Sequence, residues 1–216
     1  MKKPQNNIDA TALNIATYND PLTVADATVD AENYLPDIFG YPLFIQFNDS
    51  LPGKNILDLG CGPGLLSKYY SDHGFTVTGL DFSENMIKAA NQLCPKCRFI
   101  TKNALQLSPE KDGKFDGIVA FHLIQFFDLP QISELFQKIA ASLVENGKFL
   151  LIFTNTCHQE SGCNINPTGL TEYWNRHQLD DIAPIFHKSG LKIINFEQPK
   201  FPDGDQPFIF VAEPAK

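Results

Sequence analysis

Three glycines, Gly60, Gly62 and Gly64, stand at alternate positions directly after a short apolar run, residues 55–59. Glycine lets the backbone turn tightly, and it lets a ligand approach the chain where a Cβ atom would clash. A loop of this kind binds nucleotides only where a strand precedes it and a helix follows it, and the flanking sequence meets both conditions. The segment is therefore a candidate site for a nucleotide-containing ligand.

Two aspartates accompany this loop. Asp58 lies two positions before Gly60, and Asp81 lies about 20 residues further on, where a carboxylate suits a pair of ribose hydroxyls. A carboxylate at Asp58 attracts an ammonium group but repels a pyrophosphate, so it favours a ligand with an amino group over NAD. Asp58 could instead cap a turn and Asp81 a helix, although Ser83 can fill the second role.

The flanking sequence alternates strands with helices. Strands are expected at 55–59, 75–80, 97–101, 115–121 and 148–154, and helices at 65–73, 83–93 and 130–144. A helix at 181–189, with Pro184 near its first turn, precedes two strands at 191–196 and 208–212, whose short link favours an antiparallel hairpin. This alternation predicts an α/β, Rossmann-like, doubly wound fold, with a seven-stranded, mostly parallel sheet and an antiparallel last strand.

With these residues in place, the sequence resembles the class I S-adenosylmethionine-dependent methyltransferases, well over 54–154 and loosely over 179–212. Its glycine spacing is G-x-G-x-G, not the G-x-G-x-x-G of dinucleotide enzymes. The resemblance implies that Asp58 faces the amino-acid end of S-adenosylmethionine, that Asp81 binds both ribose hydroxyls and that Phe82 packs on the adenine. The other cofactor-binding positions implied are Gly60, Cys61, Gly62, Gly64, Met86, Asn103, Ala104 and Phe121.

Two positions depart from the family pattern. Many members have Asp where this chain has Asn103, whose side-chain carbonyl can also accept a hydrogen bond from the adenine amino group. Residues 143–149 resemble a helix-to-strand turn in which Pro-Gly-Gly is commoner, so only the geometry of that turn is affected.

Methyl transfer requires little chemistry from the protein, because the sulfonium of the cofactor already activates the methyl group. A general base is needed only where the acceptor must lose a proton. His122, at the end of the expected fourth strand, is the catalytic candidate. For this residue, as for His158 and His177 further along, the alternative is an exposed histidine or one satisfied in the core.

Residues 1–50 form a region of their own, acidic at first and then aromatic. We interpret it as loop with one or two short helices, with Pro36 and Pro42 near helix starts. The polar stretch 155–171 is long for a loop inside a domain, and such loops are usually lids, binding loops or disordered segments. We expect residues 1–50 and 155–178 to cover an acceptor site on a cofactor-binding domain, 51–216. Candidate acceptor-binding residues are Tyr18, Tyr173 and Trp174.

Composition narrows the possible partners. The formal net charge is −8, whereas a nucleic-acid binder usually shows a basic face. No apolar run reaches transmembrane length, and no apolar segment follows the N-terminal lysines as a secretory signal would require. Five scattered cysteines, an odd number, suit reduced thiols. We therefore expect a cytoplasmic monomer or homodimer with neither a nucleic-acid nor a membrane partner.

A single C-x-x-C, from Cys94 to Cys97, is the only metal-like motif in the sequence. Structural zinc needs four ligands, and no second pair stands at suitable spacing. Cys157, His158 and Cys163 could complete such a site only across the fold, so no metal is expected.

The acceptor class follows from motifs that the sequence lacks. The Asn-Pro-Pro-Tyr-like motif of amide and adenine N-methylators does not follow the fourth strand, and the Pro-Cys nucleophile of cytosine enzymes is missing. We therefore expect methyl transfer to a small-molecule acceptor. The alternatives are a methyltransferase for protein or RNA, and a protein that binds S-adenosylmethionine without turnover.

Overall fold

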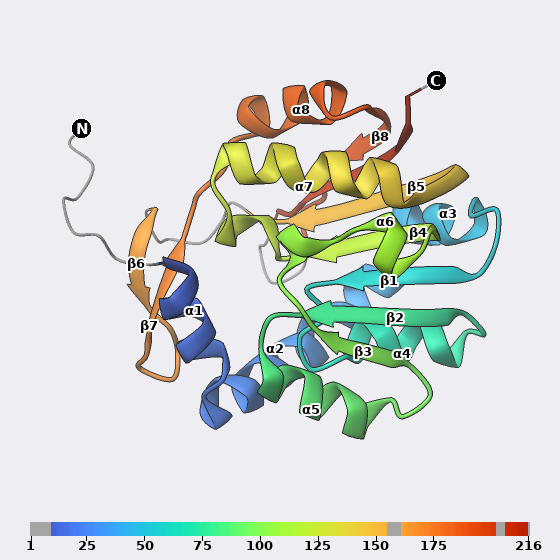
Figure 1. Cartoon of the computed structure of the whole chain (residues 1–216). Coiled ribbons are helices and arrows are strands. Elements are labelled where there is room, and N and C mark those ends of the chain that lie inside the picture. The colour runs from blue at the N-terminus through green and yellow to red at the C-terminus, as the bar shows by residue number, and fades with distance from the viewer. Residues whose placement is uncertain (1–9, 155–160, 202–205, 216) are drawn as a thin grey trace.

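The structure, a computed structural model, describes residues 10–154, 161–201 and 206–215 of the 216-residue chain. Its centre is a seven-stranded sheet with strand order β3-β2-β1-β4-β5-β9-β8 (Figure 1). The strands are β1 (Asn55–Leu59), β2 (Thr76–Asp81), β3 (Arg98–Thr101), β4 (Phe115–Phe121), β5 (Leu143–Phe153), β8 (Leu191–Glu197) and β9 (Phe208–Pro214). Strand β9 pairs antiparallel with both β5 and β8, and the other pairs are parallel. The expected doubly wound fold with an antiparallel last strand is confirmed.

Helices cover both faces of this sheet, because the buried strands carry apolar side chains on both sides. One apolar cluster joins the sheet to α7 (Leu129–Ser142) and α8 (Leu179–Lys188). The other joins it to α4 (Leu65–Asp72) and to helices from the N-terminal region. The remaining helices of this part are α5 (Glu84–Leu93), the four-residue α6 (Pro109–Asp112) and the short 3₁₀ turns η1 (Ala104–Gln106) and η2 (Ile124–Phe126).

The N-terminal region is more helical than expected, with α1 (Ala10–Tyr18), α2 (Pro21–Phe39) and α3 (Pro42–Asp49). Helix α2 begins at Pro21 because the Asp20 side chain accepts hydrogen bonds from the first-turn N–H groups. Pro42 starts a helix as expected, but Pro36 lies in the last turn of α2, so that expectation was wrong. Helix α3 packs in the second apolar cluster, so the proposed covering role of residues 1–50 rests on α1 and α2.

The stretch after β5 is not simply a loop. Strands β6 (Gly162–Ile165) and β7 (Thr171–Trp174) form an antiparallel hairpin, while residues 155–160 lie outside the described part of the chain. Pro184 also departs from expectation, because α8 begins earlier, at a capping box between Gln178 and Asp181. The proline therefore stands inside the helix, beyond its first turn.

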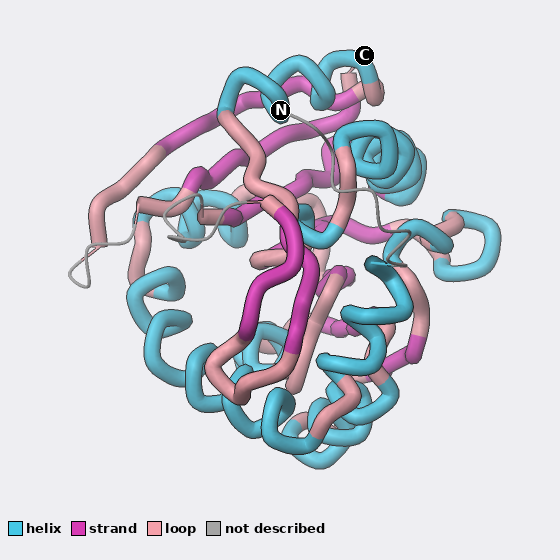
Figure 2. Tube along the Cα trace, turned by 90° about the vertical axis from the view of Figure 1, so that its left-hand side faces the viewer, coloured by secondary structure: helices cyan, strands magenta, loops and turns pink. Residues whose placement is uncertain are grey.

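The β6–β7 hairpin lies beside α1, at the edge of the sheet where the parallel strands end (Figure 1). Figure 2, viewed from that side, shows the two strands of the hairpin running together in front of the main sheet. None of the helices in the described ranges combines the length and apolar character that crossing a bilayer requires. The arrangement places two covering elements over the same edge, α1 from the N-terminal region and the hairpin from the segment between β5 and α8.

Candidate active site

A cavity of about 480 Å³ opens at the carboxyl ends of the strands, and a smaller one of about 30 Å³ adjoins it. The two cavities share Gly60, Asp81 and Phe82 in their walls. Ten of the eleven cofactor positions expected from the sequence line one or both cavities: Asp58, Gly60, Cys61, Gly62, Asp81, Phe82, Met86, Asn103, Ala104 and Phe121. The eleventh, Gly64, lines neither.

The three loop glycines serve different purposes, although each has a positive φ. A Cβ atom on Gly60 would lie 2.8 Å from a Leu123 methyl carbon, and one on Gly64 would lie 2.8 Å from the Ala90 Cβ. A Cβ on Gly62 would meet nothing within 4 Å, because this residue lines the large cavity. The first and third glycines are therefore required by packing, and the second leaves open the space that a ligand needs.

The two aspartates are buried beside this loop. Asp58 is 1% exposed and accepts a 2.6 Å hydrogen bond from the Ser67 hydroxyl. Asp81 is 8% exposed, and its two oxygens accept hydrogen bonds from the backbone N–H of Gly62 (3.0 Å) and of Ser83 (2.8 Å). Ser83 also caps α5, since its hydroxyl accepts from the Met86 N–H. Asp81 is thus not required as the helix cap.

Neither carboxylate forms an ion pair with any residue in the described part of the chain. Burial raises the pKa of Asp58 to about 7, opposed by hydrogen bonds from Ser67 and reinforced by the charge of Asp81. Burial likewise raises the pKa of Asp81 to about 6, against the hydrogen bonds from Ser83 and Gly62. The pair fits a ligand that brings a cationic amino group to one carboxylate and hydroxyl donors to the other.

The smaller cavity lies between η1 and α1. Asn103 and Ala104 line it, together with Thr11, Asn14 and Ile15, which sequence reasoning missed. The Asn103 side-chain oxygen accepts a 2.9 Å hydrogen bond from Leu105 N–H and so caps η1. One lone pair of that oxygen remains for a ligand. That Asn103 accepts a hydrogen bond from the adenine amino group stays a prediction.

The junction between α1 and α2 is tied to the start of α5. The Asn19 side-chain oxygen accepts from the Ser83 hydroxyl (3.0 Å) and from the Asn85 N–H (3.2 Å). The Ser83 hydroxyl also lies 2.7 Å from the Tyr18 carbonyl oxygen, to which it can donate instead. The N-terminal helices are therefore held next to the strand end that carries Asp81.

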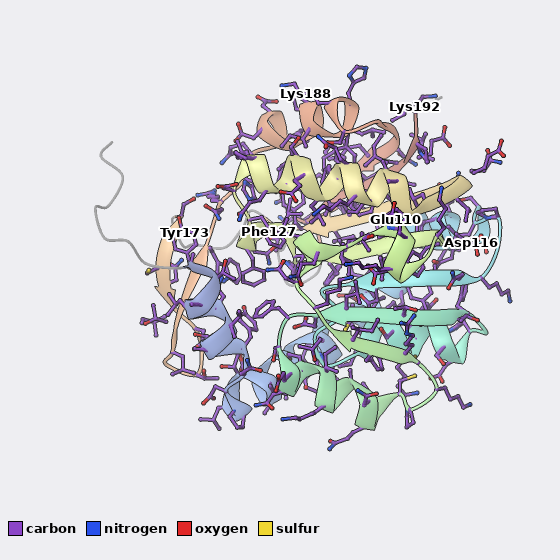
Figure 3. The ribbon with its side chains drawn as sticks, viewed as in Figure 1. Glu110, Asp116, Phe127, Tyr173, Lys188 and Lys192 are labelled. Atoms are coloured by element: carbon purple, nitrogen blue, oxygen red, sulfur yellow. The ribbon has the colours of Figure 1, made fainter. Side chains whose placement is uncertain are left out.

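Helix α1 is bonded in turn to the β6–β7 hairpin. Asn14 exchanges hydrogen bonds with the backbone of Tyr173, at 2.8 and 3.0 Å, and the Tyr18 hydroxyl donates to the buried Glu172 at 3.0 Å. Tyr18 and Trp174 line the large cavity, as expected of acceptor-binding residues. Tyr173 lines neither cavity and lies on the hairpin (Figure 3). Its contact with α1 is through the backbone.

The turn after β4, which lies next to the glycine loop, forms a further part of the wall of the large cavity. His122 lines it with a left-handed backbone (φ +49°), which is uncommon for a residue other than glycine and occurs often at functional sites. Gln125, missed by sequence reasoning, is 7% exposed, and its side-chain oxygen has no hydrogen-bond partner within the described structure. A buried polar atom without a partner beside a cavity needs an explanation, which makes Gln125 a candidate for contact with a ligand.

Hydrogen bonds to the backbone fix the turn that carries Gln125. The Asn175 N–H donates to the Gln125 carbonyl at 2.7 Å, and the His177 ring lies 3.1 and 3.0 Å from the carbonyl oxygens of Ile124 and Phe127. His177 is thus a buried structural residue, and burial lowers its pKa. Cys157 and His158 lie outside the described residues, within which no group of three or more metal-ligating side chains occurs.

Comparisons with known proteins agree with this site. A family model described as a methyltransferase domain matches residues 56–147. A ubiquinone biosynthesis O-methyltransferase from Coxiella burnetii (strain Dugway 5J108-111) is 32% identical over 172 residues, 70% of this chain and 69% of the relative. The chain belongs to the class I S-adenosylmethionine-dependent methyltransferases, so it is an enzyme and its cofactor is S-adenosylmethionine.

Solved structures share the fold across almost the whole chain. Magnesium protoporphyrin IX methyltransferase from Synechocystis PCC 6803, with bound S-adenosylmethionine, superimposes with a TM-score of 0.69 at 19% identity, covering 97% of this chain and 99% of that one. A methyltransferase from Clostridium acetobutylicum gives 0.71 at 13% identity, covering 90% and 100%. The coverage of 97% extends the shared fold to the N-terminal helices and the final hairpin of the sheet.

Because the pKa of Asp58 is raised, we expect the affinity for the cofactor to depend on pH. We expect S-adenosylhomocysteine, the product form of the cofactor, to bind about tenfold more tightly at pH 8 than at pH 6, because the charged form of a group with a pKa of about 7 is the one that binds an amino group. Calorimetry across this range measures the effect. In an Asp58→Asn variant, the affinity should change little between pH 6 and pH 8. A wild-type affinity that stays constant or falls as the pH rises would contradict the proposed contact of Asp58 with the amino group.

Proposed function

We propose that the enzyme methylates a small-molecule acceptor, which binds in the large cavity between α1, η2 and the β6–β7 hairpin. One observation carries this proposal. The cavity that holds Asp58 and Asp81 continues into a chamber lined by the aromatic side chains of Tyr18, Phe126 and Trp174. A concave site of this size suits a compact organic molecule better than a polymer. The net charge is negative, and no lysine or arginine of the described residues lines the large cavity, so its walls offer no cation to a phosphate backbone.

For the cofactor, we propose that Asp81 accepts hydrogen bonds from the ribose hydroxyls and that Asp58 accepts from the amino group. Gly62 leaves room for the ligand, while Phe82 and Ala104 form apolar walls for the adenine. When bound, S-adenosylmethionine supplies a methyl group on a positively charged sulfur. The protein's part is then to align the acceptor and to keep water out of the chamber.

For the acceptor, the chamber favours a planar, ring-bearing molecule. Tyr18, Phe126 and Trp174 bring aromatic rings together, with ring centres 5.3 Å apart for Tyr18 and Phe126 and 6.0 Å apart for Phe126 and Trp174. The side-chain oxygen of Gln125 offers a place for one hydroxyl or N–H donor. Relatives named for ubiquinone and demethylmenaquinone support a ring-bearing acceptor for this enzyme too.

Within this chamber we propose that His122 removes the acceptor proton and that Gln125 orients the acceptor. A His122→Asn variant keeps a residue that tolerates the left-handed backbone, and it should lower kcat about 100-fold or more. Gln125→Met should instead raise the acceptor KM about tenfold with little change in kcat. Steady-state kinetics with the acceptor separates the two roles, and equal effects of both variants on kcat and KM would contradict the assignment.

The acceptor class is tested by following S-adenosylhomocysteine formation with separated cell fractions. We expect turnover with the low-molecular-mass metabolite fraction and none with the protein or RNA fractions. Turnover confined to a protein or RNA fraction would overturn the small-molecule proposal. Tight binding of S-adenosylhomocysteine without turnover in any fraction would favour a protein that binds the cofactor without catalysis.

A further inference from the structure

The C-x-x-C motif, which the proposed reaction does not use, forms a close pair of thiols in the fold. Cys94 ends α5, and the chain turns back so that Cys97 N–H donates to the Cys94 carbonyl at 3.1 Å. The two sulfur atoms are 2.6 Å apart, and neither cysteine lines a cavity of the active site. No third metal-ligating side chain joins them among the described residues, which favours thiol chemistry over metal binding.

The two thiols differ in their surroundings. Burial acts to raise the pKa of Cys94, but hydrogen bonds from the Cys97 thiol, the Ser71 hydroxyl and nearby backbone N–H groups outweigh it and lower that pKa. Burial raises the pKa of Cys97, and the hydrogen-bond contact with Cys94 adds a smaller increase. Cys94 is thus the member of the pair whose surroundings favour the thiolate, the form that reacts with oxidants, and Cys97 is the member whose surroundings favour the protonated thiol.

A short path leads from this pair to the cofactor site. The Cys97 sulfur lies 3.7 Å from the carbonyl oxygen of Ser67, to which its single proton can go instead of to the Cys94 sulfur. The Ser67 hydroxyl in turn donates to Asp58 at 2.6 Å. Ser67 is fully buried on α4, so its position depends on the packing of α4 against the end of α5. A change at Cys97 therefore acts on the residue that holds the Asp58 carboxylate.

We propose that Cys94 and Cys97 are a dithiol site that hydroperoxides convert to a disulfide, and that the disulfide weakens cofactor binding through Ser67. The oxidation stands on the geometry of the pair alone. The effect on the cofactor rests on the proposed role of Asp58.

The chemistry balances with one hydroperoxide for each pair of thiols. The Cys94 thiolate attacks one oxygen of hydrogen peroxide, the O–O bond breaks, and the departing hydroxide takes a proton from solvent to leave as water. From an organic hydroperoxide the departing group is an alkoxide, which takes the same proton and leaves as an alcohol. The Cys97 sulfur then attacks the resulting sulfenic acid, the S–O bond breaks, and the leaving hydroxide takes the Cys97 proton as a second water. The two sulfurs lose two electrons, and the peroxide gains them.

The oxidation is tested on the full chain with a small molar excess of hydrogen peroxide. We expect a loss of about 2 Da, reversed by dithiothreitol, and a peptide map that links Cys94 to Cys97. Cys163→Ser serves as the matched control, because Cys163 is exposed and its removal should leave the linkage intact. Free Cys94 and Cys97 thiols in the wild type under conditions that oxidise Cys163 would overturn the proposal.

The effect on the cofactor is tested by calorimetry with S-adenosylhomocysteine. We expect the oxidised wild type to bind about two- to tenfold more weakly than the reduced protein, because the disulfide removes the thiol donor to Ser67. A Cys94→Ser/Cys97→Ser variant should bind equally well before and after peroxide treatment. Equal affinity of the oxidised and reduced wild type would refute the coupling to Ser67, whereas loss of binding in the reduced protein would contradict the cofactor assignment itself.

Discussion

Replacing Asp81 with alanine is expected to weaken S-adenosylhomocysteine binding by about 2–4 kcal/mol, because charge-assisted hydrogen bonds contribute about 1.5–3 kcal/mol each and are not additive. This corresponds to roughly 30- to 1,000-fold in the dissociation constant. The structure adds a second reason. The Asp81 side chain also accepts from the Gly62 N–H, so the variant loses an anchor of the loop that faces the cavity.

Asp116→Ala is the matched control for this variant. Asp116 also accepts a hydrogen bond from a backbone N–H at a strand end, that of Asn55 at 2.8 Å, but it lies at the opposite edge of the sheet from the hairpin that carries Tyr173 (Figure 3). Calorimetry should show near-normal affinity for Asp116→Ala and a large loss for Asp81→Ala. Unchanged affinity in a folded Asp81→Ala protein would mean that the carboxylate does not contact the ribose.

A side chain at Gly62 should have a comparable effect. Asparagine tolerates a left-handed backbone, so Gly62→Asn is compatible with the φ of +51° at this position. The added atoms meet no protein atom near the Cβ and project into the cavity. We expect S-adenosylhomocysteine affinity to fall about 100-fold or more, since steric overlap costs about 3 kcal/mol, with only a modest fall in melting temperature.

Gly190→Asn provides the comparison for Gly62→Asn. Gly190 has a φ of +77°, an added Cβ there also meets nothing within 4 Å, and the residue lines neither cavity. Its variant should share any modest loss of stability and keep full affinity in a binding titration. If Gly62→Asn binds as tightly as Gly190→Asn, the loop does not approach the cofactor.

The core of the fold could be predicted from the sequence because its signals are local. Strands β1 and β4 are apolar runs with clear ends, and each was predicted with its observed bounds. The β6–β7 hairpin was not predicted, because its strands are only four residues long and are held by contacts with α1, about 150 residues away in the chain. Helix α2 was missed because Pro36 suggested a helix start, whereas the helix already begins at Pro21.

The same distinction between local and long-range signals separates the site residues that were predicted from those that were missed. The glycine loop and the two aspartates were found by spacing alone, and the structure brings them to one cavity. Gln125 and Asn19 were missed, because an amide in a sequence carries no sign of burial or of its partners. The importance of Asn19 comes from α5, and that of Gln125 from the cavity that the turn after β4 shares with α1 and β7.

A crystal structure of the protein with S-adenosylhomocysteine tests the central assignment most directly. We expect the ribose hydroxyls within hydrogen-bonding distance of the Asp81 carboxylate, the amino group on the side of Asp58, and the ligand passing closely over Gly62. The His122 end of the cavity should remain open for the acceptor. A ligand bound with its ribose away from Asp81, or outside the cavity of these residues, would contradict the account.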